Sequence, residues 1–291
     1  MGRVTSRHKV LRLGGDAPAV VRSDTLVAEE PLDIRLGGRT ITVTMRTPGD
    51  DFDLVAGFLA AEGVIGAAED LTAMRYCAGT DDEGHNTYNV IDAALAAHVP
   101  APDPGLMRGV WTSSSCGICG STGIDGLRRM SRFDVGADPV RVDADVLYEL
   151  PDRLRAAQKV FATTGGLHAA GLFTAAGDTV CVREDVGRHN AVDKVVGWAL
   201  REGRLPLAGH VLMVSGRASF ELTQKAAMAG VPVMAAVSAP SGLAVDLAAD
   251  AGVTLVGFLR GRSGNVYTHA ERVVAARHDA LARDPGASLG Q

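Results

Sequence analysis

The chain has 291 residues, 46% of them hydrophobic and only 4% aromatic, which is enough to bury a core and favours two globular domains. A net charge of -5 and a pI near 5.9 disfavour a protein built to bind nucleic acid nonspecifically. The absence of an apolar run of spanning length or of a signal-peptide pattern predicts a cytoplasmic protein without a membrane span. Four cysteines are too few for a disulfide framework and point to functional thiols in a reducing compartment.

The first half predicts a flexible tail over residues 1–18 and a small α+β domain over 19–108. Apolar and polar residues alternate at 25–36 and again at 39–45. Gly37 and Gly38 separate the two runs, and this pattern predicts a hairpin. A helix capped by Asp50 and ended by Gly63 follows, and then weaker strands at 71–77 and 86–92. A proline-rich stretch at 99–105 marks the expected domain boundary, and residues 109–135 form a linker.

The second domain is predicted over residues 136–275, with a flexible tail at 276–291. A helix is expected from Pro151, where proline suits the first helical position. Strand-like runs then alternate with helices, which favours a largely parallel sheet covered on both faces, although the first two strands also fit a hairpin. The expected strands lie at 169–173, 180–182, 211–214, 233–237 and 253–258.

A loop of small polar residues, Ser113-Ser114-Ser115-Cys116-Gly117-Ile118-Cys119-Gly120, carries the most distinctive chemistry. Two thiols in such a loop fit a sulfur or persulfide relay, in which a thiolate accepts sulfane sulfur and passes it on. A zinc site completed by Cys77, Cys181 and His85 and a thioredoxin-like exchanger are weaker alternatives. Cys77 and Cys181 themselves stand among strand residues and fit a space-filling role.

Four segments that follow predicted strands would gather at one sheet edge if those strands are parallel, and open α/β sheets bind ligands there. They lie at 181–194, 215–219, 238–242 and 258–264. Small residues, helix starts and arginines in these segments suit phosphate, which suggests a nucleotide-like anion. Glu221 and Lys225, four residues apart, fit either a surface ion pair or a ligand-facing lysine. The candidate binding residues outside the last segment are Arg188, His189, Arg217, Ser219 and Lys225.

Three motifs, in this order, resemble the formate dehydrogenase accessory sulfurtransferase family (FdhD). They are the Ser-Ser-Ser-Cys-Gly-Ile-Cys-Gly loop, Arg183-Glu-Asp-Val-Gly-Arg-His-Asn-Ala-Val-Asp-Lys194 and Ser215-Gly-Arg-Ala-Ser-Phe-Glu-Leu-Thr-Gln-Lys225. The resemblance implies an α/β fold with a C-terminal three-layer, cytidine-deaminase-like domain and a smaller N-terminal α+β domain. It also implies Cys116 as the persulfide-bearing residue, Cys119 as its companion, and a cofactor-binding segment made of Phe258, Leu259, Arg260, Gly261, Arg262 and Ser263.

The same resemblance implies a sulfurtransferase that takes sulfur from a cysteine desulfurase. The acceptor would be the molybdenum bis(molybdopterin guanine dinucleotide) cofactor, bound as substrate, and the client the catalytic subunit of formate dehydrogenase. A guanine nucleotide such as GDP becomes an expected ligand, and a homodimer an expected assembly. Deaminase chemistry does not follow, because His189 is followed by Asn190 and Ala191 rather than by the His-x-Glu that a zinc deaminase needs. No resident metal is expected, and a noncatalytic cofactor chaperone remains the alternative function.

Overall fold

The structure, a computed structural model, describes residues 4–15, 17–77, 79, 87–102 and 131–275. Its first half contains β1 (Thr5–Gly14), β2 (Ala17–Val27), β3 (Glu30–Leu36), β4 (Arg39–Arg46), α1 (Asp51–Ala61), β5 (Leu71–Tyr76) and β6 (Val90–Leu95). None of the helices in the described residues combines the length and the hydrophobicity of a membrane span.

The second half holds a longer series of elements. They are β7 (Val142–Asp143), α3 (Ala144–Ala157), α4 (Lys159–Thr164), β8 (His168–Thr174), β9 (Thr179–Asp185), α5 (Arg188–Arg201), β10 (His210–Val214), α6 (Phe220–Met228), β11 (Val233–Ala236), α7 (Gly242–Ala251), β12 (Thr254–Arg260), β13 (Ser263–Val266) and β14 (Val273–Val274).

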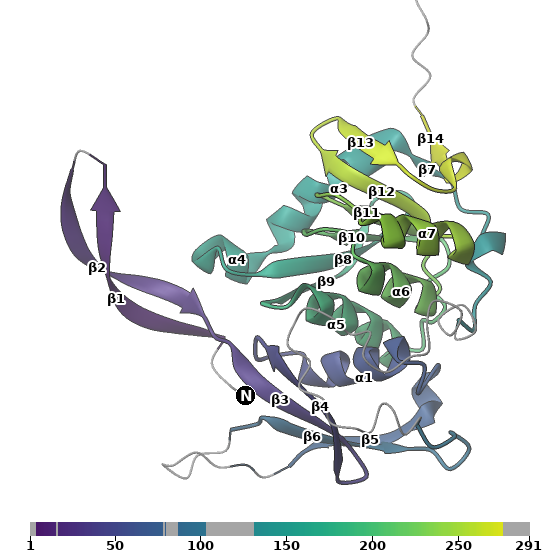
Figure 1. Cartoon of the computed structure of the whole chain (residues 1–291), viewed down its shortest axis with the longest axis horizontal. Helices are drawn as coiled ribbons and strands as arrows, with labels where there is room; N and C mark the ends of the chain where they lie inside the picture. Colours follow the sequence, from purple (N-terminus) through teal and green to yellow (C-terminus); the bar gives the residue numbers. More distant parts are fainter. Residues whose placement is uncertain (1–3, 16, 78, 80–86, 103–130, 276–291) are drawn as a thin grey trace, which may run out of the picture.

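A six-stranded sheet in the order β13-β12-β11-β10-β8-β9 forms the centre of the second half. Helices α5, α6 and α7 cover one face and α3 packs on the other, so the predicted three-layer α/β fold is confirmed (Figure 1). The prediction of a largely parallel sheet is wrong. Only β10, β11 and β12 pair in parallel, because β8 runs against both of its neighbours and β13 returns antiparallel to β12. The alternative of a hairpin for the first two strands is confirmed.

The N-terminal elements form a second sheet, β4-β3-β6-β5, which packs against α1. The predicted hairpin across Gly37 and Gly38 is confirmed, and both glycines have positive φ. Helix α1 then crosses α5 in backbone contact. A Cβ atom on Gly57 would stand 1.8 Å from the carbonyl oxygen of Asp193, and one on Gly197 would stand 1.8 Å from that of Asp53. Only glycine permits this crossing.

The two halves share one hydrophobic core. A single cluster of buried side chains includes Leu32 and Ile34 of β3, Leu59 of α1, Val195 of α5 and Leu222 of α6. A second cluster fills the space between the sheet and α3. The N-terminal half therefore supports the central sheet through the packing of α1 against α5.

Two predicted elements differ from the structure. Residues 5–14, expected within a flexible tail, form β1, which pairs with β2 as a long hairpin. Helix α3 begins at Ala144 rather than at Pro151, because the Asp143 carboxylate accepts a hydrogen bond from the Asp145 amide (2.8 Å) and caps the helix there. Pro151 lies inside the helix.

Candidate functional site at one sheet edge

The carboxyl ends of β9, β10, β11 and β12 lie at one edge of the sheet. Strand β8 is antiparallel to both β9 and β10, so β9 points in the same direction as the parallel strands. The loops after β10 and β11 continue the pairing beyond the strands, with Ala218 donating to Ala239 (3.2 Å) and Ser241 donating to Ala218 (3.0 Å). The segments that the sequence analysis selected therefore share this edge, which open α/β sheets use for ligands.

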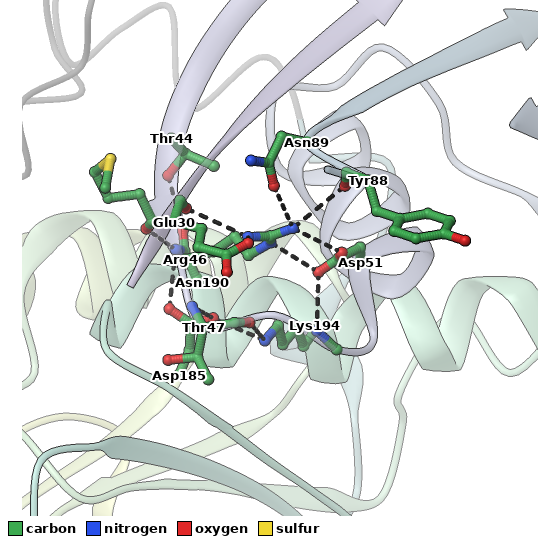
Figure 2. Close-up of polar contacts among 12 residues, drawn as sticks. Glu30, Thr44, Arg46, Thr47, Asp51, Tyr88, Asn89, Asp185, Asn190 and Lys194 are labelled. Atoms are coloured by element: carbon green, nitrogen blue, oxygen red, sulfur yellow. Dashed lines mark hydrogen bonds and ion pairs between the residues drawn. The ribbon is translucent and has the colours of Figure 1, made fainter. Parts of the chain in front are cut away.

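Part of the segment 181–194 points into the protein instead of toward the edge (Figure 2). The Asp185 carboxylate is fully buried, forms a 2.7 Å ion pair with Lys194, and accepts hydrogen bonds from the amide of Thr47, the amide of Gly187 and the side chain of Asn190. Lys194 also donates to the carbonyl oxygen of Thr47 (2.9 Å). This network joins the β4–α1 connection to α5 and is structural.

A neighbouring network has Arg46 at its centre (Figure 2). Its buried guanidinium forms a two-pronged pair with Asp51, 3.1 Å on each side, and also reaches Glu30, the carbonyl oxygen of Tyr88 and the side chain of Asn89. Bidentate pairing of this kind is the most favourable geometry for a buried arginine. Together the two networks fix the N-terminal sheet and α1 against α5.

Arg188 and His189, in the first turn of α5, belong to the edge. Arg188 Nε, His189 Nε2 and Ser219 Oγ are all shielded from solvent and have no hydrogen-bond partner among the described residues. His189 Nε2 lies 3.8 Å from the Glu221 carboxylate, longer than a hydrogen bond. Since buried polar groups in folded proteins are almost always paired, these three atoms indicate a place for a polar ligand.

His189 is neutral at physiological pH. Burial lowers its pKa to about 4, and the nearby cations Lys225 and Arg188 act in the same direction. A neutral imidazole can present Nε2 either as a donor or as an acceptor, depending on its tautomer. The residue therefore suits recognition of a polar group rather than a fixed positive charge.

His168 is an edge residue that the sequence analysis did not select. It begins β8, pairs in register with Asp185, and its ring lies 3.5 Å from the position that a Cβ atom on Gly216 would occupy. Burial lowers its pKa, and Arg188 lowers it further. The amino end of β8 meets the carboxyl ends of its neighbours because β8 is antiparallel to them. The sequence signals a strand here but not its direction, which is why His168 was missed.

Arg217 and Lys225 differ in their surroundings. Arg217 is exposed in the loop after β10 and makes no hydrogen bond or ion pair with a described residue. Lys225 is buried, and its ammonium donates to Asp193 (2.7 Å), so it neutralises a carboxylate beneath the edge. The predicted alternative of a Glu221–Lys225 surface pair is wrong, because Lys225 turns to Asp193 and Glu221 lies nearer His189.

The segment 258–263 forms the β12–β13 hairpin, and its side chains face different surroundings. Phe258 is exposed, has a φ of 54°, and its amide donates to Ser238 (3.1 Å). Arg260 is exposed and, within the described part of the chain, forms no ion pair. By contrast, Leu259 is buried in the core beneath α3.

The turn of this hairpin is formed by Gly261, whose φ is 55°, and Ser263 begins β13. Arg262 pairs with Asp145 at the start of α3 and lies over the Tyr148 ring, 5.4 Å from its centroid. Phe258, Arg260 and Ser263 are exposed. Arg262 is exposed as well but is paired with Asp145, and Leu259 is a core residue.

The edge is long. Four inter-strand steps separate β9 from β12, which at the usual strand spacing is roughly 19 Å. A ligand that contacts both Arg188 and Phe258 must have the length of a dinucleotide. A cavity of about 260 Å³ lies elsewhere, at the carboxyl ends of α6 and α7, and is not part of this edge.

Cys116 and Cys119 lie outside the described residues. Of the other cysteines, Cys181 is buried in the core, where burial raises its thiol pKa to about 11, and Cys77 is partly buried. This agrees with their predicted space-filling role. Among the described residues, no three His, Cys, Asp or Glu side chains gather as a metal site.

Comparisons with known proteins agree with the fold. Residues 27–274 match the model of the FdhD/NarQ family. A protein of Streptomyces avermitilis named "Sulfur carrier protein FdhD" is 61% identical over 94% of this chain and 97% of its own length. A protein of the same name from Mycobacterium tuberculosis is 57% identical over 94% of this chain and 100% of its own.

Among solved structures, the crystal structure of a putative formate dehydrogenase accessory protein from Desulfotalea psychrophila superposes with a TM-score of 0.71. It is 24% identical and covers 94% of this chain and 100% of its own, so it supports the fold. The match to the family model over most of the chain, together with relatives of this identity along nearly their whole length, shows that the chain belongs to the FdhD/NarQ family.

Proposed function

We propose that the protein is a cytoplasmic sulfur carrier that accepts persulfide sulfur from a cysteine desulfurase and transfers it to the molybdenum bis(molybdopterin guanine dinucleotide) cofactor, as formate dehydrogenase activity requires. One observation carries the proposal. The Cys116-Gly-Ile-Cys119 motif lies in a chain whose relatives, up to 61% identical over nearly their full length, are named sulfur carrier proteins.

The transfer needs only thiol chemistry. The Cys116 thiolate attacks the outer sulfur of the donor persulfide, the donor S–S bond breaks, and the donor cysteine leaves as a thiolate. Cys119 then attacks the inner sulfur of the Cys116 persulfide. A Cys116–Cys119 disulfide forms, and the outer sulfur leaves as hydrosulfide, which becomes a terminal ligand of the metal. A cellular dithiol reductant restores the two thiols.

The sheet edge supplies the groups to hold the second substrate. Arg188, Arg217 and Arg260 offer guanidinium groups that form no ion pair with described residues, and these suit diphosphates. His189 Nε2 and Ser219 Oγ add two polar atoms that lack partners within the described structure. The length of the edge fits a dinucleotide, and GDP is the simplest fragment with which to test it.

The first test is peptide mass spectrometry. The purified protein is incubated with a cysteine desulfurase and cysteine without reductant, and is then alkylated and digested. We expect one added sulfur on the peptide that holds Cys116 and Cys119, removable by reduction, and none on the Cys77 or Cys181 peptides. Cys77→Ala serves as the matched control and should be loaded like the wild type. No sulfur on the Cys116 peptide with any desulfurase would overturn the carrier function.

A noncatalytic cofactor chaperone is the second candidate, because the unpaired polar groups of the edge would hold the cofactor without the help of a thiol. The two functions separate in cells that lack the native gene. Under the carrier function, Cys116→Ala binds GDP normally but fails to restore formate dehydrogenase activity, whereas under the chaperone function it restores activity. Arg188→Ala should lose GDP binding under both.

A further inference from the structure

Two histidines from different elements meet at the sheet edge. His189 lies in the first turn of α5, and His168 begins β8, where it pairs in register with Asp185 of β9. The His168 ring packs on the β10–α6 loop, since a Cβ atom on Gly216 would stand 3.5 Å from its Nδ1 atom. Both imidazoles lie close enough to Arg188 for its charge to act on them. One guanidinium group therefore influences the protonation of both rings.

Both histidines are neutral at physiological pH in the free protein. Burial is the largest cause in each case, and it lowers the pKa of His168 and lowers the pKa of His189 to about 4. Arg188 lowers the pKa of both rings further, and Lys225 of α6 acts on His189 in the same direction. A proton on either ring would add positive charge beside these cations.

The carboxylates that face the two rings do not restore their charge. Glu221 of α6 raises the pKa of His189, but its carboxylate lies 3.8 Å from Nε2, longer than a hydrogen bond. Asp185 raises the pKa of His168, but this is the smallest of the three causes and the same carboxylate pairs with Lys194 at 2.7 Å. Burial and the cations therefore outweigh both carboxylates.

A diphosphate at this place would reverse the balance. Its two negative charges offset the cations, and a phosphate oxygen can accept a hydrogen bond from the protonated Nε2 of His189, which is shielded from solvent and has no partner among the described residues. Arg188 Nε and Ser219 Oγ, which lack partners in the same sense, would hold the same group. A charge on His168 lowers the pKa of His189, so one proton on the pair is favoured over two.

We propose that His168 and His189 form a proton-accepting pair, neutral in the free protein, that takes up one proton from the solvent when a diphosphate binds at Arg188. The inference rests on the proposed function, which brings a guanine dinucleotide to the edge, and it adds His168 to the residues that bind it. Because the bound state holds the extra proton, affinity rises as the pH falls. Release of the ligand returns the proton to the solvent.

The ligand used in the test must not titrate itself. The terminal phosphate of GDP gains a proton at about pH 6, which would obscure uptake by the protein. GDP-mannose is a diphosphate diester, as is each guanine dinucleotide of the proposed cofactor, and it keeps both negative charges throughout the pH range of the experiment. A change in the number of bound protons then belongs to the protein.

Isothermal titration calorimetry of the full chain with GDP-mannose, in buffers of different ionisation enthalpy, counts the protons taken up. If the bound diphosphate returns the pair to the ordinary histidine pKa of about 6.5, roughly half a proton is taken up per ligand at pH 6.5. The dissociation constant should then fall roughly three-fold or more between pH 8 and pH 6.

Two failures of this experiment have different meanings. Binding of GDP-mannose without proton uptake, and with a dissociation constant independent of pH, would overturn the proton-accepting pair and leave the edge as the binding site. Absence of binding would overturn the assignment of the edge as well. Sulfur loading of the Cys116 peptide, measured separately, reports on the carrier function in either case.

Glutamine substitutions show which side chains take up the proton. His189→Gln keeps a group that can donate to phosphate but cannot titrate, and we expect the proton uptake at pH 6.5 to fall by about half or more. The double variant His168→Gln, His189→Gln should take up none. His210→Gln, at the opposite end of β10, is the matched control and should keep the wild-type uptake. Equal uptake by the control and the double variant would contradict the proposal.

A nuclear magnetic resonance titration of the wild type avoids any effect of a substitution on folding. The Cε1–H resonances of the eight histidines are followed against pH with and without saturating GDP-mannose. We expect the ligand to raise the pKa of two of them by about one unit or more and to leave the others unchanged. Titration curves that are the same with and without bound ligand would refute the proposal.

Discussion

At the scale of single residues, the second family motif has two tasks that lie close together. Asp185, Asn190 and Lys194 turn inward and bind the N-terminal half, whereas Arg188 and His189 keep polar atoms toward the edge. Substitutions one turn apart on α5 should therefore affect different properties, the free energy of unfolding in one case and ligand binding in the other.

Lys194→Met should destabilise the fold strongly. It removes the cation that neutralises the buried Asp185 and leaves a carboxylate without a charge partner, which costs about 3–5 kcal/mol. Denaturant unfolding followed by circular dichroism measures the change. Lys159→Met, at an exposed position at the start of α4, is the control and should unfold as the wild type does. Equal midpoints for the two variants would contradict the structural assignment.

The lowered pKa of His189 makes stability depend on pH. Between the ordinary histidine pKa of about 6.5 and the folded value of about 4, the unfolded chain binds a proton that the folded chain does not. Stability therefore falls as the pH falls through this window. His189→Gln removes this contribution, so its loss of stability from pH 7 to pH 4.5 should be smaller than that of the wild type. His8→Gln, at an exposed position of β1, is the control substitution.

Cys181 should be silent in thiol chemistry. Burial raises its thiol pKa to about 11, so very little thiolate exists at pH 8 and the side chain is covered as well. Alkylation of the native protein should modify Cys181 only after unfolding, as peptide mass spectrometry will show. Rapid labelling of Cys181 at pH 8 in the folded state would contradict this.

At the scale of elements, the α1–α5 crossing holds the two halves at the closest distance that backbones allow. Gly57→Ala would drive a methyl group into the Asp193 carbonyl oxygen, and we expect a loss of about 3 kcal/mol or more of unfolding free energy. Gly242→Ala, at the start of α7 with open space around it, is the matched control and should be neutral or slightly stabilising. Thermal unfolding of both variants decides the point.

Sequence patterns predicted most elements and the gathering of loops at one edge. Periodicity locates strands but does not give their directions, and both the antiparallel β8 and the role of His168 depend on direction. Likewise, the sequence alone does not show which charged residues beside a strand face a ligand and which face the core. Asp193 and Lys225 resemble solvated helix residues in the sequence and form a buried pair in the fold. Leu259 belongs to the segment that the resemblance implies as cofactor-binding, and the packing of α3 makes it a core residue.

At the scale of the whole molecule, the shared core predicts one cooperative unfolding transition. The cluster that joins β3, α1, α5 and α6 takes side chains from both halves, so neither half encloses this larger cluster by itself. Circular dichroism and tryptophan fluorescence should report the same midpoint. A fragment of residues 131–275 should lose cooperative unfolding, because the face of α5 that meets α1 would be open to water. A fragment as stable as the full chain would contradict this.

The glycine crossing also has a mechanical consequence. With Gly57 and Gly197 against opposing backbone atoms, α5 can neither slide along nor roll over α1 without a clash. Arg188 and His189 sit on the first turn of that helix, so we expect them to keep their positions when the proposed ligand binds. The edge is then a preorganised site under the proposed function. Binding would require little free energy for rearrangement of the protein.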